Sequence, residues 1–153
     1  MTGLFAAAPV GTSASPDTVR APQVSAPSES LHTPRILFVE DYPGMRSLVN
    51  TMLQPSFEVE GAATYDDALA QAQATSFDLF LIDINLNGEA NGLDLLHTLR
   101  GHPRHRHTPT IACTAYVSPT ERKRILNAGF DAYLSKPFRK ERLVSMVWTF
   151  LSS

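Results

Sequence analysis

The chain of 153 residues has room for one domain of ordinary size, and its hydrophobic fraction of 43% is typical of a globular protein. A formal net charge of −2 implies no polyanionic partner, and a single cysteine, Cys113, excludes an internal disulfide. No apolar run approaches the roughly 20 residues that a membrane-spanning helix needs, and no basic residue precedes the weakly apolar segment Leu4–Val10 as in a signal peptide, so we expect a cytoplasmic protein.

Residues 1–33 differ in composition from the rest of the chain. They are rich in Ala, Pro, Ser and Thr, have no sustained hydrophobic period, and carry the three charged residues Asp17, Arg20 and Glu29. Such a segment cannot bury enough apolar surface to offset the entropy that it would lose on ordering. We therefore expect a flexible N-terminal extension over residues 1–33 and one folded domain over residues 34–153.

Five short apolar runs after residue 34 predict β-strands. In chain order they are Ile36–Val39, Phe57–Ala62, Leu79–Ile82, Thr110–Cys113 and Ala132–Leu134. The runs are continuously apolar, which indicates strands that are buried on both faces of a parallel sheet. Because segments with helical spacing separate the runs, right-handed crossovers predict an α/β fold with an open, doubly wound sheet.

Apolar residues three or four positions apart predict the helices between and after these strands. They are Met45, Leu48, Val49 and Met52, then Ala68, Leu69 and Ala72, then Leu93, Leu95, Leu96 and Leu99, and finally Leu143, Val147, Phe150 and Leu151. We expect Thr64 to cap the second helix. Ser118 and Glu121 are expected to form a capping box at the start of the fourth helix, which ends at a left-handed Gly129. The closing helix is predicted to begin near Pro137.

Polar residues stand where the predicted strands end. Glu40 and Asp41 follow the first strand, Asp83 the third, Thr114 the fourth and Lys136 the fifth. In an open parallel sheet, ligands bind outside the carboxyl ends of the strands. We therefore expect three carboxylates, a hydroxyl and an ammonium at one edge of the sheet.

Carboxylates gathered in this way repel one another unless they take up protons or hold a cation. Oxygen ligands without Cys or His favour Mg²⁺ or Mn²⁺ over zinc, with Asp41 and Asp83 as ligands and Glu40 acting through a water. A carboxylate beside such a metal can attack phosphorus and form an aspartyl phosphate. Lys136 and Thr114 have the donors that would stabilise the transferred phosphoryl group.

Four segments around these residues resemble the signature segments of response-regulator receiver domains of two-component signalling, in the family's order and at its spacing. They are Arg35–Asp41, Leu79–Asp83, Ile111–Ala115 and Leu134–Phe138. The resemblance implies a flavodoxin-like (βα)5 fold over residues 34–153, with the strand order 2-1-3-4-5. The roles that it implies are an acidic pair at Glu40 and Asp41, the phosphoacceptor Asp83, a metal-binding backbone carbonyl at Asn85, the switch residues Thr114 and Tyr133, a phosphoryl-pairing Lys136, and a cis Lys136–Pro137 bond.

The resemblance also implies a function: a phosphorylation-dependent switch served by a sensor histidine kinase or a histidine phosphotransfer protein. Because no output domain follows Ser153 in this sequence, the expected output is a surface on the fourth helix, fifth strand and fifth helix. A downstream protein or a second copy in a homodimer would use that surface, and no nucleic acid or membrane is expected to bind. Slow hydrolysis of its own acyl phosphate is expected rather than turnover of an external substrate, so the chain is not predicted to be an enzyme.

Two features depart from the family's usual pattern: the acidic pair begins with Glu40 rather than Asp, and the loop after Asp83 differs. The loop from Asp83 to Gly92 has no proline and one residue more than is usual, which affects kinase recognition along this edge. Asn85 and Tyr116 occupy positions that flank the approach of water to the phosphate in this family. Tyr116 is therefore expected either to shield the phosphate or to pack at the strand end.

Other interpretations are possible for several of these residues. An aspartyl phosphohydrolase would carry its nucleophile on the first strand with a second Asp two residues on, whereas Asp83 lies on the third and precedes Asn85. A phosphate-independent adaptor would not need the complete set of site residues. Tyr133 could be a packing residue. We interpret the histidines of residues 102–107 as solvated rather than as transition-metal ligands, and Glu121–Arg124 as a solvated or partner-binding surface.

Overall fold

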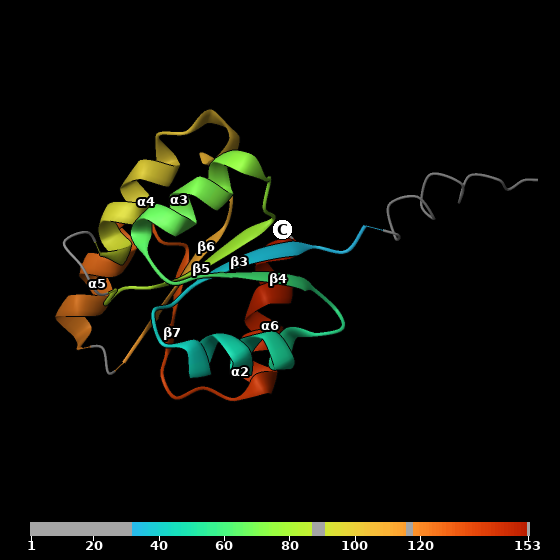
Figure 1. Ribbon diagram of the computed structural model, residues 1–153. Helices are drawn as coiled ribbons and strands as arrows, with labels where there is room; N and C mark the ends of the chain where they lie inside the picture. The colour runs from blue at the N-terminus through green and yellow to red at the C-terminus, as the bar shows by residue number, and fades with distance from the viewer. Residues whose placement is uncertain (1–31, 87–90, 116–117, 153) are drawn as a thin grey trace, which may run out of the picture. The chain divides into compact units, whose positions relative to one another are not determined.

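The computed structural model describes residues 32–86, 91–115 and 118–152 (Figure 1). Its strands are β3 (Arg35–Val39), β4 (Glu58–Ala62), β5 (Leu79–Asp83), β6 (Thr110–Thr114) and β7 (Ala132–Ser135). Its helices are α2 (Pro43–Leu53), α3 (Tyr65–Ala74), α4 (Gly92–Arg100), α5 (Pro119–Ala128) and α6 (Lys140–Leu151), with a short 3-10 helix η3 (Pro103–His105). Nearly all of the extension expected over residues 1–33 falls outside the described residues, so its flexibility stays a prediction.

The described strands form one parallel sheet in the order β4-β3-β5-β6-β7. Counted along the chain from β3, this is the order 2-1-3-4-5, so the expected flavodoxin-like topology is confirmed. Figure 1 shows α3 and α4 on one side of the sheet and α2 and α6 on the other. Helices on both faces bury the three central strands, β3, β5 and β6, which explains their almost continuously apolar sequences, whereas the outer strands β4 and β7 remain partly exposed.

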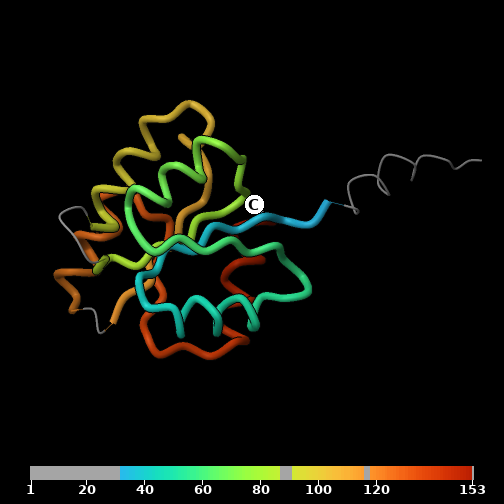
Figure 2. Tube along the Cα trace, viewed as in Figure 1, coloured from blue at the N-terminus to red at the C-terminus, as the bar shows by residue number. Residues whose placement is uncertain are grey.

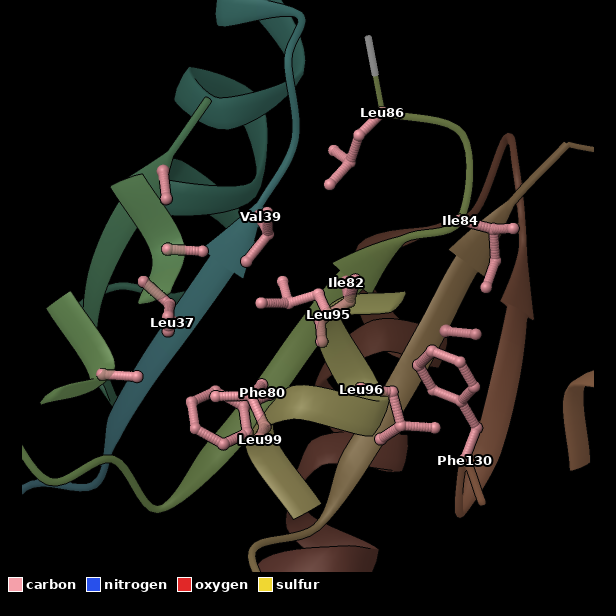
Figure 3. Close-up of a cluster of buried hydrophobic side chains, with 14 of the residues drawn as sticks. Leu37, Val39, Phe80, Ile82, Ile84, Leu86, Leu95, Leu96, Leu99 and Phe130 are labelled. Atoms are coloured by element: carbon pink, nitrogen blue, oxygen red, sulfur yellow. The ribbon is translucent and has the colours of Figure 1, made fainter. Parts of the chain in front are cut away.

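Alternate residues of each strand enter two separate hydrophobic cores. In β3, Leu37 and Val39 face the core beneath α3 and α4, whereas Ile36 and Phe38 face the core beneath α2 and α6. Figure 3 shows the first core, where side chains of β3 and β5 meet the buried leucines of α4. A slip of one residue would exchange the two sets, so this packing defines the register of the sheet and the place where each strand ends.

The bounds of the strands match the prediction to within one residue, but the closing helix does not begin where it was expected. It begins at Lys140 rather than near Pro137, because Arg139 still has the extended backbone of an N-cap residue, with φ −91° and ψ 154°. The Lys136–Pro137 bond is cis, as the family resemblance implies. No helix in the described ranges is both long and apolar enough to span a membrane, and α6 has 12 residues.

The predicted helix ends are largely confirmed. Thr64 Oγ1 accepts a hydrogen bond from the Asp67 N–H at 3.0 Å. Ser118 Oγ accepts one from the Glu121 N–H at 3.1 Å, so Ser118 caps α5 as expected, but only this half of the predicted capping box is formed. Gly129 has a φ of 116°, in the left-handed region. The sequence analysis missed a complete capping box at the start of α4, in which Asn91 and Asp94 bond each other's backbone. Asn and Asp at this spacing perform the task that Ser or Thr and Glu or Gln perform more often.

The prediction that the histidines before β6 are solvated is wrong for His105. This residue is 1% exposed, and its ring stands edge-on to Phe80 with centroids 5.1 Å apart. Its Nε2 lies 2.7 Å from the Ala72 carbonyl oxygen, and since a carbonyl only accepts, Nε2 donates. Burial lowers the pKa of His105, so the ring is neutral and links η3 to α3 as a packing residue.

Replacing Gly129 by alanine is expected to lower the free energy of unfolding by about 1–2 kcal/mol, because an L-residue is strained in left-handed backbone. The added Cβ would meet only Leu96 Cδ2, at 3.5 Å, so crowding does not contribute. Gly101→Ala is the matched control, since Gly101 also follows a helix but has a φ of −78°. Urea unfolding should show Gly101→Ala to be neutral or more stable by up to about 1 kcal/mol. Equal losses in the two variants would contradict the assignment.

Candidate functional site

The residues predicted to form the site lie where the strands end. Glu40 and Asp41 follow β3, Asp83 ends β5, Thr114 ends β6 and Lys136 follows β7. Figure 2 shows that the chain leaves β3, β5 and β6 toward the same side of the sheet, at the left of the view. The parallel topology therefore brings together residues that are far apart in the sequence.

Lys136 connects the carboxylates that follow two different strands. Its Nζ donates to Glu40 Oε1 at 2.7 Å and to Asp83 Oδ2 at 3.3 Å. Burial by itself lowers the pKa of the ammonium, but the hydrogen bond to Glu40 and the charge of Asp83 outweigh that effect and raise the pKa of Lys136. Lys136 is therefore charged at neutral pH, and among the described residues it is the one cation that forms ion pairs with this cluster.

Glu40 is the most buried carboxylate of the cluster, at 2% exposure. Its Oε2 accepts a hydrogen bond from the Tyr42 N–H at 3.2 Å, and its Oε1 is held by Lys136. Burial raises the pKa of the Glu40 carboxyl, and this effect exceeds that of the hydrogen bonds from Lys136 and Tyr42, which lower it. A single ammonium thus leaves the ionised cluster short of positive charge, which favours a further cation.

Asp83 is 4% exposed, and both of its carboxylate oxygens have partners. Oδ1 accepts a hydrogen bond from the Asn85 N–H at 3.0 Å, and Oδ2 lies against Lys136. Gly92 packs directly behind this residue: a Cβ there would come within 2.8 Å of Ile84 Cα and closer still to the Asp83 carbonyl oxygen. Because only glycine fits, α4 begins against the backbone of Asp83. Residues 87–90 of the longer loop lie outside the described residues.

Three carboxylates form the one group of potential metal ligands that the described residues contain. Glu40, Asp41 and Asp83 each offer an oxygen, and these atoms lie within 4.8 Å of one another. The donors are all oxygen, with neither histidine nor cysteine among them, and such a set fits Mg²⁺ or Mn²⁺. The Asn85 backbone contacts the same cluster through its N–H, which donates to Asp83 Oδ1, and the metal-binding role of its carbonyl stays a prediction.

Thr114 and Tyr133 occupy different places with respect to the cluster. Thr114 is 5% exposed, and its carbonyl oxygen accepts a hydrogen bond from the Lys136 N–H at 2.7 Å, so it adjoins the segment that holds the lysine. The half-buried Tyr133 packs against the core beneath α3 and α4, and its hydroxyl lies 3.1 Å from Arg122 Nη1 of α5. The tyrosine hydroxyl is thus bound to α5 in this structure, and Tyr116 lies outside the described residues.

The sequence analysis missed Arg46, whose Nη1 donates to the Glu40 carbonyl oxygen at 2.6 Å. Its side chain passes over Gly61 of β4, where a Cβ would lie 3.0 Å from Arg46 Cδ. Arg46 thereby attaches α2 to the segment that carries the acidic pair. No local pattern indicates this contact, because the arginine reaches a backbone atom across a turn rather than a charged side chain.

The arrangement matches known proteins over most of the chain. The family model described as the response regulator receiver domain matches residues 36–148. The sensor protein GacS of Pseudomonas syringae pv. syringae is 32% identical over 132 residues, which cover 82% of this chain and 14% of that protein. The phosphate regulon transcriptional regulatory protein PhoB of Klebsiella pneumoniae is 35% identical over 114 residues, covering 74% of this chain and 49% of that protein. This chain therefore spans less than half the length of either relative.

Solved structures agree with this match. The chemotaxis protein CheY4 of Vibrio cholerae superposes with a TM-score of 0.74 and 29% identity, covering 78% of this chain and 99% of that one.

Replacing Glu40 by glutamine is expected to raise the free energy of unfolding of the metal-free protein at pH 7. Because the folded-state pKa of Glu40 lies above its ordinary value of 4.5, the folded protein holds this proton more tightly than the unfolded chain. The wild type thus loses stability as pH rises from 4.5 through the raised pKa, whereas the variant does not. Urea unfolding in a chelator should show this advantage at pH 7 and its loss below pH 4.5.

The control is Glu60→Gln, on β4 outside the cluster, which should show no such pH-dependent gain. A Glu40→Gln protein less stable than the wild type at pH 7 would mean that the ion pair with Lys136 outweighs the cost of burial.

Proposed function

Because the chain belongs to the response regulator receiver domain family, we propose that it is a two-component signalling switch that accepts a phosphoryl group on Asp83. The donor would be a sensor histidine kinase or a histidine phosphotransfer protein. Phosphorylation of Asp83 would change the conformation of the surface formed by α5, β7 and α6, to which a protein partner binds. The observation that supports this most strongly is the position of Asp83, held between Lys136 and two further carboxylates at the end of a buried strand.

The chemistry follows from the surroundings of Asp83. One of its oxygens forms the bond to phosphorus while the bond between phosphorus and the donor histidine nitrogen breaks. Bound Mg²⁺ would neutralise the carboxylates and hold an oxygen of the transferred phosphoryl group, with Glu40, Asp41, Asp83 and the Asn85 carbonyl as its ligands or water-mediated partners. The proposed ligands supply oxygen atoms, and Lys136 supplies the remaining positive charge.

Lys136 is positioned to exchange partners when the phosphoryl group arrives. In the unphosphorylated structure, Lys136 Nζ lies 2.7 Å from Glu40 Oε1 and 3.3 Å from Asp83 Oδ2, so the ammonium is closer to Glu40. A phosphoryl group on Asp83 adds nearly two negative charges to this side of the lysine. We therefore expect the ammonium to move toward the phosphoryl oxygens, and the Thr114 hydroxyl to donate to another of them.

Tyr133 would carry the change to the surface. Its hydroxyl is bound to Arg122 on α5, while the backbone of β7 continues directly into Lys136. Movement of Thr114 toward the phosphoryl group would free space into which the tyrosine ring turns, and this movement would break the contact with Arg122. The α5–β7–α6 surface would then present a different set of side chains to a downstream protein or to a second copy.

The acyl phosphate would be lost by slow hydrolysis at the same site, with no external substrate turned over. We propose a cytoplasmic location, in which a kinase and its acceptor can meet, and no nucleic acid as a direct ligand. The N-terminal extension, predicted over residues 1–33, is proposed to lie outside the switch.

The first test of this proposal is labelling by a small phosphodonor. Incubation with acetyl phosphate and Mg²⁺ should place one phosphoryl group on Asp83, mapped by mass spectrometry. Asp83→Asn should abolish the label, a chelator should prevent it, and Asp41→Ala should weaken Mg²⁺ binding by about tenfold or more. Asp66→Asn, which neutralises an exposed carboxylate at the start of α3, is the control and should label normally. Labelling of Asp83→Asn at the wild-type level would refute the assignment.

The second test separates phosphate acceptance from transmission. Thr114→Ala should still take up label, because the attacking carboxylate and Lys136 remain. It should fail to transmit the change, since the hydroxyl that follows the phosphoryl group is gone. Amide chemical shifts of α5 and β7, recorded with and without acetyl phosphate, measure the response. If the phosphorylated variant shows the same shifts as the phosphorylated wild type, the coupling through Thr114 is wrong.

A further inference from the structure

The small net charge of the chain conceals a strong separation of charge along it. Residues 34–100 contain ten Asp or Glu and three Lys or Arg, whereas residues 101–153 contain three and nine. The first part builds β4, β3 and β5 with their helices, and the second part builds β6, α5, β7 and α6. Because the sheet order places β6 and β7 together at one side, the separation in sequence becomes a separation in space.

Six of these cations lie on the helices that precede and follow β7, the last strand at this side of the sheet. They are Arg122, Lys123 and Arg124 on α5, and Arg139, Lys140 and Arg142 at the start of α6. All six are exposed, and none of them forms an ion pair with a described residue; the acidic Asp131 nearby is paired with Arg100. α5 and α6 pack against opposite faces of the sheet, so the helices that carry the cations lie on both sides of it (Figure 1). We call these six residues, with Leu126 and Tyr133, the basic surface.

Two apolar features accompany these cations, one on α5 and one beside the start of α6. Leu126 is 43% exposed on α5, one turn after Arg122, and the half-buried Tyr133 lies beneath Arg122. A groove along the start of α6 is lined by Phe138 together with Arg139 and Arg142. Apolar residues that are surrounded by charged ones are typical of protein–protein interfaces, where the apolar contacts are shielded from water by a polar rim.

We propose that the basic surface binds an acidic segment of a protein partner. Carboxylates of that segment would pair with the six cations, while one or two of its apolar side chains would cover Leu126 and the Phe138 groove. This inference rests on the proposed function, because it gives the chemistry of the partner that the α5–β7–α6 surface would serve. The charge complementarity would also speed the encounter between the two proteins.

The same residues disfavour two other occupants. Glu121 and Glu141 are interspersed among the cations and would repel a phosphate backbone, so a nucleic acid fits less well. A two-fold dimer brings the same surface of both copies together, and would therefore oppose cations with cations. An acidic protein segment need not carry a charge at every position, so its carboxylates can pair with the cations while uncharged or apolar residues lie opposite Glu121 and Glu141.

Arg122 connects this surface to the switch. Its guanidinium donates to the Tyr133 hydroxyl through Nη1 at 3.1 Å, and a partner's carboxylate that forms a bidentate pair with the two Nη groups would compete with the hydroxyl for that donor. Binding of the acidic segment would thus favour release of Tyr133, and release of Tyr133 by phosphorylation would favour binding. This reciprocity is required of any two events that share one equilibrium.

The test uses the full chain and a fluorescein-labelled peptide of twelve residues that contains six Asp or Glu and three Leu. Fluorescence anisotropy in 50 mM salt should detect binding, and 300 mM salt should weaken it. The double variant Lys123→Glu/Arg124→Glu should weaken binding by about tenfold or more. Arg104→Glu/Arg106→Glu is the matched control, since it changes the net charge by the same amount in the loop before β6, and it should stay within about twofold of the wild type. Acetyl phosphate should tighten binding to the wild type.

Equal weakening in the two double variants would overturn the proposal, because it would show attraction by net charge alone. Tighter binding of a 20-base-pair DNA duplex or of phosphatidylserine vesicles would assign the surface to another partner. Self-association of the free chain through this surface would also overturn it. The Lys123→Gln/Arg124→Gln protein removes the two positive charges without reversing them. It should also bind the peptide more weakly while its circular dichroism spectrum stays native, which excludes misfolding as the cause. Labelling of wild-type Asp83, measured in parallel, tests the proposed function separately from the peptide.

Discussion

The ion pairs of Lys136 are the contacts on which the arrangement of the site depends. The lysine follows β7 at one side of the sheet, yet its ammonium reaches Glu40, 96 positions earlier in the chain, and Asp83, 53 positions earlier. Each of these carboxylates is almost completely buried, and a buried charge without a partner is strongly unfavourable. The ammonium compensates part of this cost but not all of it, as the raised pKa of Glu40 shows. A cluster that is incompletely neutralised favours the uptake of a further cation.

The sheet makes these contacts possible because it is rigid where the charges meet. Alternate residues of the strands enter two cores, so neither a slip in register nor a tilt of one strand is tolerated. Gly92 adds a local constraint, since α4 begins in contact with the backbone of Asp83 and admits no side chain there. Arg46 adds another by holding the carbonyl oxygen of Glu40. The packing of the strands, the contact of α4 with Asp83 and the hydrogen bond from Arg46 thus all position the same cluster of carboxylates.

The same chain segment that holds the lysine also leads to the surface. Residues 132–136 contain Tyr133, whose hydroxyl is bound to α5, and Lys136, whose N–H is bound to the Thr114 carbonyl oxygen. A change at the phosphoryl site therefore has a short path to α5. The basic surface includes Arg122, which also binds the Tyr133 hydroxyl. The same arginine would therefore take part both in partner binding and in the switch. Phosphorylation and partner binding would be two influences on one contact.

The sequence by itself determined most of the fold and the composition of the cluster. The bounds of the strands and an open parallel sheet follow from short apolar runs, helical periods and the handedness of crossovers. The strand order 2-1-3-4-5 is implied by the resemblance of four segments to receiver domains. The residues at the strand ends could be identified because a parallel sheet places every strand end at one edge, whatever the side chains are. Their chemical roles stay predictions until the labelling experiments are done.

Only the tertiary structure decided the contacts between distant residues. His105 lies in a polar, basic loop, and nothing local shows that its ring fills a space beside Phe80. The sequence did not show that Lys136 is closer to Glu40 than to Asp83, that Arg46 binds a backbone carbonyl, or that Arg122 holds Tyr133. Patterns of polarity record which face of an element is buried. They do not record which atoms meet across two elements, because that depends on the distances and angles at which the elements pack.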